Sequence, residues 1–305
     1  MIIRAFIAIV VVATAASQVS AQACPAKPLR LIVPSAAGSP PDIQARWLGD
    51  RLAGALGQPV VVENRPGAGG HIGARVAAES APDGYTILYA HQGVLAFNPH
   101  LYAQPGYDAL RLIPIARIGV IPLAVAVRPG LNAATLAELV RLAKEQPNKL
   151  TLGTSPLGAP PHLAGELFRR IVGIDVTLVP FKGSAIMEVV GGHVDFTLDI
   201  ISAVLRQARA GKVRVLAVTS AKRVASLPDV PTFREAGAPD YVFETWAAYC
   251  VPGGTPASIV ARLTDEIGKI GGSAIAREWT SANGYEPVSE TQAALAAMVR
   301  EEHAR

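Results

Sequence analysis

The sequence has few charged residues and no long run of either sign. Charged residues make up 17% of the 305 residues, and the formal net charge is only +4. No block of lysine and arginine and no basic helix face occurs, so we expect no nucleic-acid partner. Half of the residues are hydrophobic, which argues against disorder, and 305 residues are long enough for two domains with cores of their own.

Cysteine is also scarce, since the sequence contains only Cys24 and Cys250. In an exported protein such a pair can form a disulfide. A disulfide and two free thiols are equally compatible with the sequence, because Cys24 lies near the N-terminus and Cys250 in an apolar, strand-like run. No histidine is close to either residue in the sequence, so we predict that neither thiol is catalytic.

The common catalytic motifs are missing. The sequence contains no P-loop lysine pattern, no G-x-S-x-G and no S-x-x-K. The six histidines, at positions 71, 91, 100, 162, 193 and 303, lack metal-ligand spacing. We therefore predict no catalytic residue, no metal and no cofactor. An exported hydrolase is a weak alternative, because no nucleophile–base pattern supports it.

The glycine-rich segment NRPGAGGHIG (64–73) matches a dinucleotide-binding loop only in part. It follows a strand-like run and begins a helix, but Ile72 stands where the third glycine of G-x-G-x-x-G is needed. The next strand ends without an acidic residue to hold a ribose. We interpret the segment as a turn packed closely beneath the first half of the protein.

The longest apolar run lies at the N-terminus and is short. It follows Arg4, extends from Ala5 to Ala16 and ends before Ala21-Gln22-Ala23. About a dozen residues do not reach the roughly 20 that a membrane-spanning helix needs, and small residues at these positions are what a signal peptidase reads. The pattern predicts a signal peptide over residues 1–23 and a periplasmic location. The alternatives are a membrane anchor and a lipoprotein anchored at Cys24, for which Ala21 is a poor cleavage-site residue.

After the signal peptide, strand-like and helical patterns alternate. Strand-like runs include LRLIVP (29–34), PVVVEN (59–64), YTILYA (85–90) and IGVIPLAVAV (118–127). The alternation predicts an α/β protein of mostly parallel sheets flanked by helices. Two similar series predict two lobes, with lobe 1 formed by residues 24–123 and 224–305 and lobe 2 by residues 124–223.

Two proline pairs follow strand-like runs, in GSPPD (38–42) and GAPPH (158–162). Proline suits the first turn of a helix, and in an open parallel sheet such turns lie at the carboxyl edge, where ligands bind. The free N–H groups of a helix start suit an anion. Stiff helix starts are the alternative for either motif alone, but the pair predicts a cleft that holds an anion from both sides. We expect the available N–H groups to come from residues 36–39, 42, 157–159 and 162.

The predicted ligand-binding residues come mainly from these two loops. They are Ser35, Ala36, Ala37, Gly38, Ser39 and Asp42 in the first loop, Ser155, Leu157, Gly158, Ala159 and His162 in the second, and His91, Gln92 and Asp199 elsewhere. Asp199 lies in the apolar run DFTLDII, where a carboxylate needs a hydrogen-bond partner or a cavity. Asp42 has the alternative role of favouring its helix start, and His162 that of capping or packing.

Several segments together resemble a known family. They are KPLRLIVPSAAGSPPD, GQPVVVENRPGAGGHIGA, APDGYTILYA, HLAGELF, VPFKGSA, GGHVDFTLD, AGKVRVLAVTSAKR and LPDVPTFREAG. In this order they resemble the substrate-binding proteins of tripartite tricarboxylate transporters, also called Bug receptors, over essentially the whole mature chain. The resemblance implies a two-lobed periplasmic binding protein fold (type II-like), with crossover strands and a carboxylate held between Ser35–Asp42 and Ser155–His162. It also maps the family aspartate, which meets the ammonium group in amino-acid-binding members, onto Asp199.

The sequence departs from the family at the pocket. Ser35 replaces a usual aromatic residue, Ser39 a usual glycine, and Ala159 and Pro160 usual hydroxyl residues. We therefore expect a small carboxylate ligand but infer no particular one. The expected function is capture of that solute, as a monomer, for the membrane permease subunits of a tripartite tricarboxylate-type transporter. The alternative is a receptor that signals to a membrane sensor kinase.

Overall fold

The structure is a computed structural model that describes residues 25–104 and 106–304. The predicted signal peptide (1–23) and Cys24 lie outside the described residues. Cys250 is fully buried, and burial raises the pKa of its thiol. In the described part of the chain, every helix is too short or too polar to cross a membrane.

Helices and strands alternate along the described chain as predicted. The strands are β1 (Leu29–Val33), β2 (Val60–Asn64), β3 (Thr86–His91), β4 (Ile113–Val127), β5 (Thr151–Thr154), β6 (Thr177–Pro180), β7 (Phe196–Ile200), β8 (Arg214–Val218), β9 (Glu244–Val251) and β10 (Glu286–Pro287). The α-helices are α1 (Pro40–Leu56), α2 (His71–Ala78), α3 (Asn98–Leu101), α4 (Leu136–Glu145), α5 (Pro160–Val172), α6 (Ile186–Val190), α7 (Ile201–Arg209), α8 (Ala257–Gly271), α9 (Ala274–Ala282) and α10 (Gln292–Ala304). Short helical turns are η1 (Ala68–Gly70), η2 (Gly93–Phe97) and η3 (Ala109–Arg111).

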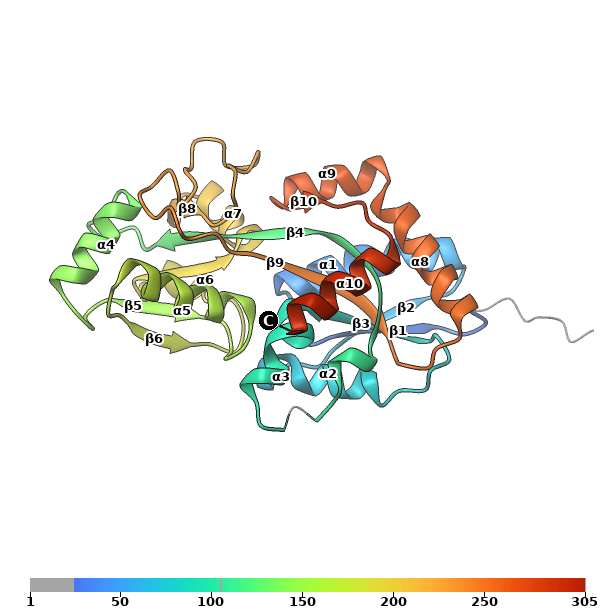
Figure 1. The fold of residues 1–305 in the computed structure, drawn as a ribbon. Helices are drawn as coiled ribbons and strands as arrows, with labels where there is room; N and C mark the ends of the chain where they lie inside the picture. The colour runs from blue at the N-terminus through green and yellow to red at the C-terminus, as the bar shows by residue number, and fades with distance from the viewer. Residues whose placement is uncertain (1–24, 105, 305) are drawn as a thin grey trace, which may run out of the picture.

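The strands form two mostly parallel halves joined by long crossover strands. In the first lobe β1 pairs in parallel with β2 and β3, and in the second lobe β5 pairs in parallel with β6 and β7. Strand β4 pairs with β9 up to Pro122 and with β7 from Leu123 onward, so it passes from one lobe to the other, as Figure 1 shows. This confirms the predicted α/β fold with two lobes, each a sheet flanked by helices.

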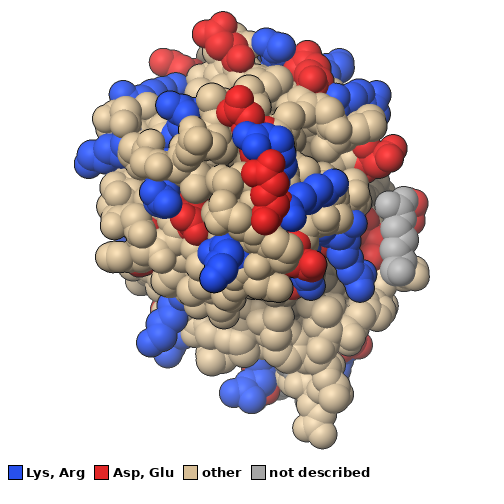
Figure 2. Space-filling view, turned by 90° about the vertical axis from the view of Figure 1, so that its left-hand side faces the viewer, with Lys and Arg blue, Asp and Glu red and all other residues tan. Residues whose placement is uncertain are grey.

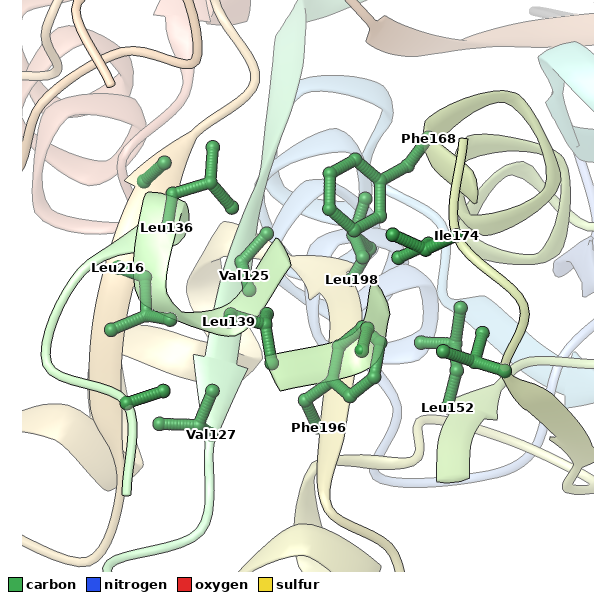
Figure 3. Close-up of a cluster of buried hydrophobic side chains, with 14 of the residues drawn as sticks. Val125, Val127, Leu136, Leu139, Leu152, Phe168, Ile174, Phe196, Leu198 and Leu216 are labelled. Atoms are coloured by element: carbon green, nitrogen blue, oxygen red, sulfur yellow. The ribbon is translucent and has the colours of Figure 1, made fainter. Parts of the chain in front are cut away.

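Each lobe has its own apolar core. In the second lobe, side chains of β4, β5 and β7 pack against α4 and α5, and Figure 3 shows Phe168, Phe196 and Leu198 pointing into the same cluster. In the first lobe, Leu31 and Val33 of β1 pack against Leu48 and Leu52 of α1. All seven of these side chains are completely buried, and such burial stabilises each by about 1.5–3 kcal/mol.

The segment before β9 packs with the second lobe, whereas residues 224–305 were predicted in lobe 1. The ring of Phe233 lies 5.4 Å from that of Phe168, and the ring of Tyr241 lies 5.9 Å from it. The hydroxyl of Tyr241 donates to the carbonyl oxygen of Ala164 at 2.9 Å. Residues 224–243 therefore lie with the second lobe, because the chain returns to the first lobe only along β9.

Charges on the outer end of the second lobe are mixed. Figure 2 views the molecule from this end and shows positive and negative side chains interspersed over the face. Ion pairs on the helices of this lobe include Arg141–Glu145 of α4 at 2.8 Å and Arg169–Glu166 of α5 at 2.7 Å. Exposed pairs of this kind contribute little to stability.

Candidate functional site

The two proline-pair turns face a common cavity between the lobes. The cavity has a volume of about 80 Å³, which is room for a small organic ligand or several waters, since one water needs about 10–15 Å³ on this measure. From the first loop it is lined by Ser35, Ala36, Ser39, Pro40 and Pro41, and from the second by Ser155, Pro156, Ala159, Pro160 and Pro161. The prolines begin α1 and α5 as predicted, so each of the two walls is formed by a turn that leads into a helix started by prolines.

Half of the predicted ligand-binding residues line this cavity. They are Ser35, Ala36, Ser39, His91, Ser155, Ala159 and Asp199. The other seven do not belong to its lining and are Ala37, Gly38, Asp42, Gln92, Leu157, Gly158 and His162. The structure gives most of this second group a role in shaping the loops or joining elements.

Asp42 organises the first loop from behind. Its buried carboxylate accepts hydrogen bonds from the N–H of Gly38 at 2.8 Å, from Asn64 Nδ2 at 2.9 Å and from Arg46 Nε at 3.0 Å. Burial alone would raise the pKa of Asp42, but the hydrogen bonds from Arg46, Gly38 and Asn64 hold it below its usual value. Asp42 is therefore ionised at neutral pH and fixes the turn that precedes α1, a role beyond the helix-start one considered for it.

Both turns use some of the N–H groups expected to face the ligand. In the first loop the N–H of Gly38 is taken by Asp42, and that of Ser39 donates to the carbonyl oxygen of Ala36 at 3.2 Å. In the second loop Ala159 donates to Pro156 at 2.9 Å and His162 to Ala159 at 3.0 Å. The expectation was wrong for these four N–H groups, because a tight turn satisfies them internally. Within the described residues the N–H groups of residues 36 and 37 form no hydrogen bond.

Asp199 presents a buried carboxylate at the second-lobe wall. It is 1% exposed and accepts hydrogen bonds from Ser184 Oγ at 2.6 Å, Ala185 N–H at 2.9 Å and Ile200 N–H at 2.8 Å. Burial raises its pKa, and the hydrogen bonds only partly counter this. None of the ion pairs among the described residues involves Asp199. A buried carboxylate without a cation favours either a proton or a positively charged ligand group.

His91 supplies a neutral donor on the opposite wall. It ends β3, is buried and lines the cavity. Its Nδ1 accepts the N–H of Val94 at 3.3 Å, so the neutral ring carries its proton on Nε2. Burial, with a smaller contribution from the neighbouring His71, lowers the pKa of His91 to about 4. At neutral pH the imidazole is therefore uncharged and can donate through Nε2–H.

Gln92 and His162 do not belong to the cavity lining. The amide of Gln92 donates to the carboxylate of Glu302 at 2.5 Å, which ties it to α10. The ring of His162 is half-buried, with its Nδ1 unpaired in the described part of the chain, and burial lowers the pKa of this histidine. A packing role, considered for His162, fits this position.

Other elements bring to the cavity further residues that were not predicted from the sequence. They are Pro34, Pro66, Gly67, Gly69, Gly70, Tyr89, Ile121, Lys182, Gly183, Ser184, Ile200, Thr245 and Trp246. Trp246 and Thr245 belong to the crossover strand β9, whose apolar pattern carries no local signal for a pocket. The glycine-rich turn at 66–70 was interpreted as packing alone, although its closeness to a strand end was a usable signal.

The two lobes, the crossover strands and the shared cavity define a solute-binding protein of the periplasmic type. The family model described as "Tripartite tricarboxylate transporter family receptor" matches residues 44–305. The chain belongs to this family, which confirms the resemblance noted in the sequence.

Relatives and solved structures support the same assignment. The chain is 37% identical over 280 residues to protein BugT of Bordetella pertussis, covering 90% of this chain and 86% of BugT. It is similar to the structure of Rhodopseudomonas palustris Rpa4515 with adipate, with 34% identity, a TM-score of 0.90 and coverage of 92% and 95% of the two chains. It is also similar to MatC of the same species with bound malate, with 30% identity, a TM-score of 0.87 and coverage of 92% and 98%.

Proposed function

We propose that this protein is an exported receptor that captures a small carboxylate between its lobes. It delivers the solute to the membrane permease subunits of a tripartite tricarboxylate-type transporter. The observation that carries the proposal is the single cavity shared by the loops at Ser35–Ser39 and Ser155–Ala159. Two related proteins of known structure are named with adipate and with malate, which favours a carboxylate here as well.

The donors around the cavity suit a carboxylate end. The N–H of Ala36, the hydroxyls of Ser35 and Ser155 and Nε2–H of His91 form no hydrogen bond within the described residues. A hydrogen bond to a charged group contributes roughly 1.5–3 kcal/mol. About four such bonds contribute roughly 6–12 kcal/mol. Less an entropy cost of association of at least about 4 kcal/mol, they reach at most the roughly 8 kcal/mol of a micromolar ligand. Binding therefore needs no catalytic group, and we propose none.

The rest of the cavity restricts the body of the ligand. Prolines of both loops, together with Ile121 and Trp246, form apolar walls. Asp199 faces the same space and has no cation partner in the described chain. A carboxylate with a compact apolar body fits these walls, and its far end carries either an ammonium group or a second carboxylic acid that shares a proton with Asp199.

Calorimetry and thermal unfolding with a panel of acids test the proposal. The panel holds mono-, di- and tricarboxylates, aromatic acids and amino acids, with the matching amides or alcohols as controls. A ligand at 100 times its Kd adds about 2.7 kcal/mol to the stability of the folded state, so the right acid raises Tm and its amide does not. If no acid shifts Tm or releases heat, the proposed function is wrong.

The export route and the partner are parts of the same proposal. We propose cleavage of residues 1–23, a periplasmic monomer, and docking on a permease rather than on a membrane sensor kinase, because the matching family is the receptor family of such transporters. Co-purification with each partner from membranes distinguishes the two. Mass spectrometry of the mature protein shows whether the chain begins after residue 23 and whether Cys24 carries a lipid.

A further inference from the structure

The second-lobe turn meets the first lobe at the edge of the cavity. The hydroxyl of Tyr102, just after α3, donates to the carbonyl oxygen of Leu157 at 3.1 Å. The same carbonyl lies so close to Gly69 that a Cβ built there would overlap it, and a Cβ built on Gly93 would overlap the carbonyl oxygen of Gly158. The backbone of the turn therefore lies directly on first-lobe backbone at two glycines.

Asn98 connects both sides of this contact. It is completely buried, and its Nδ2 donates to the carbonyl oxygen of Gly69 at 2.8 Å. Its Oδ1 has no hydrogen-bond partner in the described chain and faces Gly158, since a Cβ on this glycine would overlap it. None of Asn98, Tyr102, Leu157 and Gly158 lines the cavity.

The ring of Tyr102 is held within the first lobe. It packs on the imidazole of His71, with ring centroids 4.1 Å apart. Burial raises the pKa of Tyr102, so the hydroxyl is protonated at neutral pH and can donate. The hydroxyl bonds to Leu157 of the second lobe, so this hydrogen bond forms when the lobes close.

Tyr107 offers a natural counterpart on the other side of the same histidine. Its ring lies 5.5 Å from that of His71. Its hydroxyl donates to the carbonyl oxygen of Val94 at 2.7 Å, a bond that stays within the first lobe. The two tyrosines therefore share a neighbour and a type of hydrogen bond but differ in whether that bond joins the lobes.

We propose that Tyr102 is a positioning residue that latches the turn at Leu157 to the first lobe and slows ligand release without touching the ligand. This inference rests on the proposed function. Ser155 and Ala159, on either side of the latched turn, line the cavity, so holding Leu157 holds this wall over the ligand. Since the bond exists only in the closed form, it shifts the equilibrium toward that form and acts on dissociation more than on association.

The test compares Tyr102→Phe with Tyr107→Phe, each of which removes one hydroxyl and keeps the ring on His71. Adipate is the first probe and malate the second. By stopped flow we expect Tyr102→Phe to release the bound acid about 3- to 10-fold faster, which corresponds to one lost hydrogen bond. The association rate stays as in the wild type. Tyr107→Phe is expected to release the acid at the wild-type rate, while Tm falls in both variants.

Small-angle scattering of the ligand-free chain gives a second readout. We expect a larger radius of gyration for Tyr102→Phe than for Tyr107→Phe and the wild type, because fewer molecules are closed. Equal release rates for the two variants overturn the latch. If the wild type binds neither acid, the proposed function fails for these probes. The latch is then tested by scattering alone, and equal radii of gyration for Tyr102→Phe and the wild type overturn it.

Discussion

The indole Nε1 of Trp246 donates to the carboxylate of Glu302 at 3.2 Å, so the last helix contacts a residue that lines the cavity. The same carboxylate accepts the amide of Gln92 at 2.5 Å. Figure 1 shows α10 crossing the first lobe toward the second, and Glu302 in its last turn contacts Trp246 of the cavity lining. His303 follows Glu302 and bonds to the carbonyl oxygen of Leu95 at 3.0 Å. The end of the chain therefore supports the cavity wall.

Removal of this support is expected to affect both stability and binding. We expect Glu302→Ala to lower the free energy of unfolding by about 3 kcal/mol, because two hydrogen bonds to a charged acceptor are lost, and to weaken ligand binding because Trp246 is freed. Glu302→Gln keeps one acceptor and is expected to lose about half as much. Urea unfolding and calorimetry measure the two effects, with Glu278→Ala on the exposed face of α9 as the control. A loss of stability and affinity in Glu278→Ala as large as that in Glu302→Ala would contradict a supporting role for Glu302.

The fold was predictable because its rules are local. Neighbouring residues determine the short apolar strands and the proline pairs at helix starts. They also determine the ends of α1 and α5, where Gly57 and Gly173 adopt the left-handed region. The return crossover was misplaced because Phe233 and Tyr241 carry no strand pattern. Their packing on Phe168 and the hydrogen bond from Tyr241 to Ala164 show that they lie with the second lobe.

The candidate site was predictable only where it is built from one segment. The two loops were found because each contains its own turn signal. The role of Asp42 in fixing the turn could not be read from its own segment, because its partner Asn64 belongs to β2. Trp246 was missed for the same reason, since β9 brings it to the cavity from far along the chain. The direction of the Gln92 side chain depends on α10, which no local pattern reveals.

One isosteric substitution tests whether the carboxylate of Asp199 pairs with an ammonium group of the ligand. Asp199→Asn keeps the shape and removes the charge. We expect it to weaken binding of amino acids at least about tenfold more than binding of simple carboxylates, because an ammonium group loses its counter-ion. Calorimetry with matched pairs, such as an amino acid and its deaminated acid, measures the difference. Equal losses for both members of a pair would make Asp199 a structural acid that holds Ser184 and Ala185.

His91 is expected to make stability fall in mild acid. Its pKa is about 4 in the folded protein, against an ordinary value of 6.5, so the unfolded chain binds the proton first. Stability therefore decreases as pH falls from 6.5 toward 4, by up to about 3 kcal/mol. We expect His91→Gln to remove this part of the decrease in stability with falling pH. Urea unfolding between pH 7 and pH 4.5 compares the two proteins, and the raised pKa of Asp199, present in both, cancels in the difference. Parallel curves would show that His91 is protonated equally in both states.

Lobe closure gives the last prediction, through two glycines that both have a positive φ. Gly158 has φ +81° and Gly173 has φ +66°, but a Cβ on Gly158 overlaps Asn98 of the first lobe, whereas a Cβ on Gly173 meets nothing within 4 Å. Alanine at either position carries a comparable backbone strain of about 1 kcal/mol. Only Gly158→Ala adds a clash that arises when the lobes close.

We therefore expect similar urea midpoints for Gly158→Ala and Gly173→Ala but very different ligand affinities. Gly158→Ala should weaken binding about 100-fold or more, because the closed form is blocked and the binding-competent fraction falls in proportion. Gly173→Ala should bind as the wild type does. Equal affinity in both variants would mean that the contact between Gly158 and Asn98 is absent from the ligand-bound form, and that the lobes close along a different surface.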